Sequence, residues 1–110
     1  MLLEKEDCLA YGATGRSAAG FRLQFGTEAN VRLAAASIAM FEGLSEELEY
    51  PYDLELYQGG YLILAYSPSS LAQLEKNARL QREVAGADTR ILSPEEIGEM
   101  VPSLSLDGVL

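Results

Sequence analysis

Apolar residues recur along the chain with two different periods, and each period predicts a different kind of element. Between 28 and 42 the intervals are three and four residues, which is typical of one face of an amphipathic helix. That face carries Val31, Ala34, Ile38 and Phe41. The pattern predicts a helix from about 28 to 42 with Thr27 as its N-cap. Beyond it the sequence leaves two alternatives, an end at Gly43 or another turn or two before Pro51.

Serine followed by proline marks the start of two more predicted helices. The pair at 67–68 and the later Gly86 are typical of the two ends of one helix. The inner face of this helix carries Leu71, Leu74 and Ala78. The pair at 93–94 is followed by Glu96 in the spacing of a capping box, so we expect a third helix that ends before Pro102.

Alternation of apolar and polar residues, the second period, predicts strands between these helices. FRLQF at 21–25 and DLELY at 53–57 alternate in this way. YLILAY at 61–66 is a β-rich apolar run, TRIL at 89–92 is predicted as a further short strand, and MLLEK at 1–5 as the end of an earlier strand. A turn signal at 58–60 predicts a hairpin, and the run after it is apolar on both faces, as in a buried strand. The order of elements predicts an α+β fold.

Composition limits the number of domains and excludes some classes of partner. A chain of 110 residues is long enough for one domain. Its net charge of −9, from 17 acidic and 8 basic side chains, argues against nucleic acid as a partner. No apolar run reaches the roughly 18 to 20 residues of a membrane span, and the acidic start is unlike a signal peptide. A cytoplasmic protein is expected.

Several kinds of catalytic chemistry are excluded by residue counts. The sequence has one cysteine, Cys8, and no histidine. Intrachain disulfides, Cys/His zinc sites and Ser-His or Cys-His nucleophile pairs therefore cannot form. No metal site and no catalytic side chain is predicted, so chemistry here would need a cofactor.

The segment GATGRSAAGFRLQFG at 12–26 is unusually rich in small residues. Such residues let a bulky group approach the backbone, and a carboxylate at a strand end, here Glu4, can accept hydrogen bonds from ribose hydroxyls. Together these features suit a dinucleotide. The alternative for Glu4 is a solvated acid, and for Arg16 and Ser17 it is an ordinary polar loop.

Four separated segments carry a family resemblance. They are LLEK at 2–5, GATGRSAAGFRLQFGTEANVRLA at 12–34, YQGGYLILAYS at 57–67 and LSPEEIGEMVPSL at 92–104. In these segments the chain resembles the FAD-dependent amine and amino-acid oxidoreductases, the family of D-amino-acid oxidase, sarcosine oxidase and glycine oxidase. The resemblance implies FAD as cofactor and a small amino acid or amine as substrate, oxidised at its C–N bond with hydride transfer to the flavin.

The resemblance also implies a role for particular positions. Glu4 falls on the acid that binds the adenosine ribose, and Arg22 falls on an arginine that pairs with the substrate carboxylate. Flavin contacts fall on Thr14, Gly15, Arg16 and Ser17. Residues 1–26 would then belong to a partial Rossmann-like FAD-binding element, and residues 27–110 to part of the substrate-domain sheet with its helices.

The sequence departs from the family pattern in one respect, because no GxGxxG phosphate loop is present. The chain is therefore expected to be an internal part of a longer protein and not to retain FAD by itself. The alternative is a catalytically inert α+β module that binds no flavin. Such a module would self-associate, for example as a dimer, through exposed sheet edges.

Overall fold

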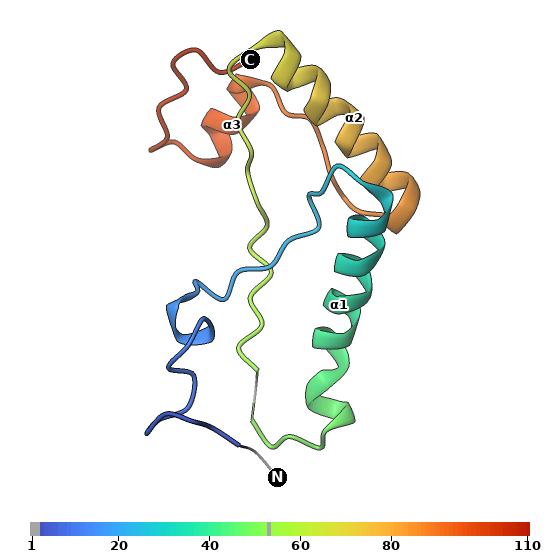
Figure 1. The fold of residues 1–110 in the computed structure, drawn as a ribbon. Coiled ribbons are helices and arrows are strands. Elements are labelled where there is room, and N and C mark those ends of the chain that lie inside the picture. The colour runs from blue at the N-terminus through green and yellow to red at the C-terminus, as the bar shows by residue number, and fades with distance from the viewer. Residues whose placement is uncertain (1–2, 53) are drawn as a thin grey trace.

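The computed structural model describes residues 3–52 and 54–110, and the regular structure in these ranges is helical. A short 3-10 helix, η1 (Thr14–Arg16), precedes three α-helices, which are α1 (Glu28–Glu47), α2 (Pro68–Ala85) and α3 (Pro94–Met100). The start of α1 packs against the later part of α2, and within the described ranges no other two helices are in contact (Figure 1). Long extended segments join these helices.

The molecule is elongated and has a small core. It measures 52 × 31 × 25 Å, with a radius of gyration of 17.9 Å. A compact domain of this length has a radius of gyration of about 13 Å. The accessible surface is 8810 Å², whereas a compact monomer of this mass exposes about 6,000 Å². Much of the apolar surface is therefore still in contact with solvent.

The core lies where the start of α1, the middle of α2 and the last residues meet. Its buried apolar residues are Val31, Ala65, Ala78, Ile97 and Val109. Val31 in α1 is completely buried. The N–H of Leu110 donates to the carbonyl oxygen of Ala65 at 3.0 Å, which ties the end of the chain to the extended segment before α2.

Caps define the two later helices as predicted. The Ser67 hydroxyl accepts from the N–H of Ser70 at 3.1 Å, and Gly86 ends α2 in the left-handed conformation with φ of 62°. Ser93 and Glu96 form the predicted capping box of α3. These bonds satisfy main-chain groups that have no partner within the helix.

The first helix is longer than the first predicted bound, and its N-cap is Thr27 as predicted. It continues through Gly43 to Glu47, because a single glycine weakens a helix by only about 1 kcal/mol. Thr27 occupies the predicted N-cap position and its carbonyl oxygen accepts from the N–H of Val31 at 3.0 Å, but its side chain makes no capping bond. An ion pair between Glu28 and Arg32, with 2.8 Å between Oε1 and Nη2, strengthens the first turn instead.

The predicted α+β fold with a sheet is wrong. The runs at 21–25, 54–57, 61–66 and 89–92 form no strand in the described part of the chain. Alternation fits a strand, but a strand also needs a neighbouring backbone to bond with, and none lies in register here. The hairpin is absent as well, because 54–66 continues past 58–60 as one long extended segment (Figure 1). Residues 1–2 and 53 of the predicted strands lie outside the described residues.

We expect Val31→Ala to lower the free energy of unfolding by about 2 kcal/mol, because it removes two buried methyl groups and leaves a cavity between α1 and α2. Urea unfolding followed by circular dichroism measures this. Leu33→Ala is the matched control on the same helix. Leu33 is 68% exposed, so its truncation should change stability by less than about 0.5 kcal/mol. Equal effects of the two substitutions would contradict the assigned core.

Candidate functional site

The glycine-rich segment folds back toward the start of the chain and encloses a shallow hollow of about 740 Å³. Its lining residues are Glu4, Lys5, Glu6, Tyr11, Gly12, Ala13, Arg16 and Ser17. All of them are exposed, so the hollow is open to solvent. Three predicted FAD contacts, Glu4, Arg16 and Ser17, therefore lie around the same hollow although up to 13 positions separate them in the sequence.

Local hydrogen bonds hold this loop in shape. The N–H of Gly15 donates to the carbonyl oxygen of Ala10 at 2.9 Å and closes a turn just before η1. The Ser17 hydroxyl donates to the carbonyl oxygen of Thr14 at 3.0 Å and accepts from the N–H of Ala19 at 3.2 Å. The side chain of Ser17 is thus used at least in part by the loop itself.

Two glycines of the segment have different roles. A Cβ on Gly15 would collide with the carbonyl oxygen of Ala10, so this position must be glycine for the turn to close. A Cβ on Gly12 would meet no atom within 4 Å. Gly12 therefore leaves open surface at the hollow, whereas Gly15 is needed for the fold of the loop.

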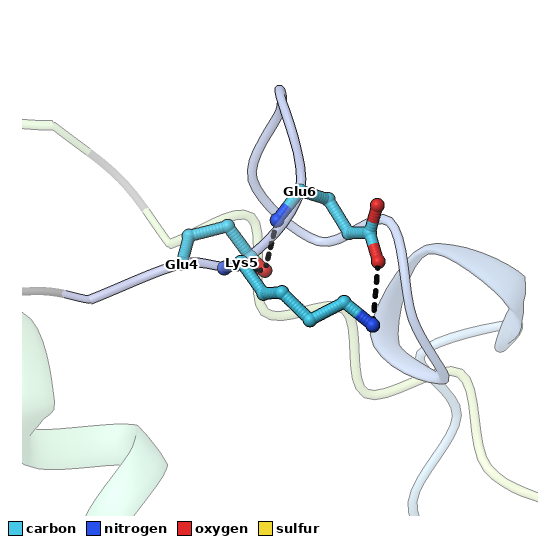
Figure 2. A network of polar contacts seen from close by, with 3 residues as sticks. All are labelled: Glu4, Lys5 and Glu6. Carbon is cyan, nitrogen blue, oxygen red and sulfur yellow. Dashed lines mark hydrogen bonds and ion pairs between the residues drawn. The ribbon is translucent and has the colours of Figure 1, made fainter.

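Glu4 is oriented by its own main-chain neighbours. Its Oε1 accepts from the N–H of Lys5 at 2.7 Å and from the N–H of Glu6 at 3.0 Å (Figure 2). Lys5 Nζ pairs with Glu6 Oε1 at 3.1 Å, so these two charges balance each other. Within the described ranges Glu4 Oε2 has no donor, which leaves it able to accept a hydrogen bond from a ligand.

Arg16 brings a positive charge to the hollow. In the part of the chain that the structure describes, its guanidinium forms no ion pair, in contrast to Lys5. A guanidinium offers several N–H donors in a planar arrangement that suits phosphate and carboxylate groups. The hollow thus combines one acceptor carboxylate oxygen with one cation able to bind an anion.

Comparison with known proteins gives one positive result. The model of the family described as FAD dependent oxidoreductase matches residues 1–110. The chain belongs to this FAD-dependent oxidoreductase family. Searches of curated proteins and of solved structures gave no match. The broad family expected from the motifs is confirmed, and with it FAD as the family's cofactor.

Some of the predicted site residues do not line the hollow around Glu4. Thr14 and Gly15 belong to the η1 turn beside the hollow but do not line it. Arg22 lies outside it, exposed, with Cζ 5.6 Å from the centroid of the Phe25 ring. The structure therefore groups the predicted ribose and flavin contacts only in part, and it does not bring the predicted substrate contact to them.

A second, smaller cavity of about 330 Å³ was not predicted. It lies against α2 of this FAD-dependent oxidoreductase chain, and Gln81, which is 2% exposed, forms part of its wall. The sequence contains one signal for it. Gln81 continues the spacing of the apolar face formed by Leu71, Leu74 and Ala78, and a polar residue on such a face is more informative than an apolar one.

The described residues provide neither a metal-binding cluster nor a membrane-spanning helix. In residues 3–52 and 54–110 no three Cys, Asp or Glu side chains are grouped so that they could hold a metal ion. Across the same ranges, no helix combines the length and the apolar character needed to cross a membrane.

We expect Gly15→Ala to open the turn before η1, because the new Cβ would collide with the Ala10 carbonyl. Amide hydrogen exchange at position 15, measured by NMR, should become about fivefold faster, as expected for the loss of one turn hydrogen bond. Gly12→Ala makes the same chemical change where there is space and should leave this exchange rate unchanged. If both variants keep the amide equally protected, the turn does not depend on Gly15.

Proposed function

We propose that this chain supplies one wall of the FAD site of an enzyme that oxidises the C–N bond of an amino acid or N-methyl amine, as sarcosine oxidase and glycine oxidase do. The observation that carries the proposal is the hollow around Glu4, Arg16 and Ser17. These side chains come from two parts of the sequence that the family resemblance links to the same cofactor. FAD, when bound, supplies the acceptor for the hydride removed from the substrate.

The residues present fit a dinucleotide. Glu4 Oε2 accepts hydrogen bonds from the adenosine ribose hydroxyls, since Oε1 is already occupied by two main-chain N–H groups. Arg16 binds negative charge on the cofactor. Ser17 lines the hollow, and Thr14 and Gly15 lie in the turn beside it, where small side chains permit close approach of the cofactor. Residues 1–26 then serve the cofactor, and residues 27–110 belong to the substrate domain.

The openness of the hollow determines how tightly it can hold FAD. Ligand sites usually bury most of the surface of their ligand, whereas every residue around this hollow is exposed. One open wall provides the polar contacts but excludes little water. Strong retention of FAD therefore requires further polypeptide over the hollow, and the chain alone should bind the cofactor weakly and reversibly.

We expect the purified chain to bind added FAD with a dissociation constant of about 0.1–1 mM, corresponding to about −5.5 to −4 kcal/mol, and to lose it on desalting. Arg16→Gln should weaken binding about threefold to fivefold, because an exposed ion pair contributes less than about 1 kcal/mol. Flavin fluorescence titration at low ionic strength measures both.

The matched control is Arg79→Gln in α2, an exposed arginine that lines neither cavity. Both variants make the chain more negative by one charge, so only the position of the arginine differs. Equal affinities of the two variants would contradict a role for Arg16. A chain that refuses FAD would instead support the inert module, whose self-association the large exposed surface favours.

For the substrate we propose that Arg22 pairs with the carboxylate of an amino acid. In the enzyme that contains this chain, Arg22→Gln should raise KM for the amino-acid substrate about tenfold, as expected for one lost charge-assisted hydrogen bond. The corresponding amine without a carboxylate is the control, and its KM should stay the same. Steady-state kinetics with both substrates measures the two KM values. An equal rise in KM for both would contradict this role of Arg22.

A further inference from the structure

The second cavity is separate from the proposed FAD wall. It lies between α2 and the two extended segments at 59–65 and 88–92, and none of its residues lines the hollow around Glu4. Its volume of about 330 Å³ falls at the lower end of the range of small-molecule sites. The buried part of its wall is mostly apolar and includes Ala65, Ala78, Ile97 and Val109.

Two residues of this wall carry a buried polar atom without a hydrogen-bond partner in the described ranges. Gln81 Nε2 donates to the carbonyl oxygen of Phe25 at 2.9 Å, which fixes the orientation of the amide group. Gln81 Oε1 is buried and has no partner among the described residues. The same is true of Gln24 Oε1, which belongs to the residue next to Phe25. Both glutamines line the cavity.

The polar and charged groups of the wall indicate which kind of ligand the cavity could bind. Buried carbonyl-type oxygens almost always accept a hydrogen bond, so the two free oxygens call for a donor. The only acidic and basic side chains in the described wall are Asp88 and Arg90, which pair with each other at 3.7 Å. The side chains of the described wall therefore carry no unbalanced charge with which to bind an ion. A neutral molecule with an apolar body and an N–H or O–H group matches it.

We propose that this cavity binds a small, neutral, largely apolar molecule that donates a hydrogen bond to Gln24 or Gln81. The cavity would be a ligand site in addition to the FAD site, and it does not depend on FAD binding. The competing occupant is water, which could also donate to both oxygens in a cavity of this size. A ring that carries a donor can be distinguished from water, because only the ring also makes apolar contacts with the wall.

Indole is a suitable probe, since it has a flat apolar ring and one N–H donor. The chain contains no tryptophan, so indole emission can be separated from that of its six tyrosines, which absorb and emit at shorter wavelength. We expect saturable binding with a shift of the emission to shorter wavelength, as the ring leaves water. 1-Methylindole keeps the ring but lacks the donor, and it should bind at least fivefold more weakly. Equal binding of both rings, or no binding of either, would overturn the proposal.

Substitutions test which oxygens accept the bond. Gln24→Met and Gln81→Met each remove one acceptor while keeping the side-chain length, and the double variant should bind indole and 1-methylindole equally. Gln73→Met makes the same change on the exposed part of α2 and should keep the preference for indole. Because Gln81→Met also removes the bond to Phe25, its helix content is checked by circular dichroism, while Gln24→Met leaves that bond intact. A preference that survives in the folded double variant would refute the assignment.

Discussion

The hydrogen bond from the Gln81 side chain to the Phe25 carbonyl oxygen is the contact that holds the two halves of the chain together. It joins the later part of α2 to the residue just before the turn into α1, across 56 positions of sequence. Because Gln81 is almost completely buried, water cannot compete well for this bond. Together with Val31, it fixes the contact between α1 and α2, and thereby the direction in which the glycine-rich segment leaves the helices.

The extended segments explain why so much surface stays exposed. Tyr61, Leu62 and Ile63 are 50%, 43% and 41% exposed, although the run they form is apolar on both faces. Such a run is typical of a strand covered on both sides by other elements. Here its backbone forms no ladder within the described ranges, and a pairing backbone would satisfy its N–H and C=O groups while covering these side chains. The small core is therefore a consequence of missing sheet pairing rather than of a shortage of apolar residues.

The helices could be predicted because their signals are local. Caps such as Ser67 and Ser93 act within three residues, and the structure contains both. The predicted sheet was wrong, because strand pairing depends on residues distant in sequence, which a local alternation does not report. The grouping of Glu4, Arg16 and Ser17 was predictable, since a single turn closed at Gly15 brings them together. Arg22 lies beyond that turn. The cavity beside Gln81 depends on tertiary contacts, and its one local signal is a polar residue on the apolar face of α2.

The two cavities differ in the kind of recognition that their burial allows. Charges at the hollow around Glu4 and Arg16 act through solvent, where two charges 4 Å apart interact by only about 1 kcal/mol. Such a site can orient an anionic cofactor but gains affinity only when it is covered. The cavity beside Gln81 is partly open, since Tyr61 and Leu62 in its wall are exposed. The Gln81 side chain itself is buried, so a neutral hydrogen bond to it is expected to contribute more than one at the open hollow. Covering the hollow would therefore change the affinity of the proposed FAD site more than that of the proposed site beside Gln81.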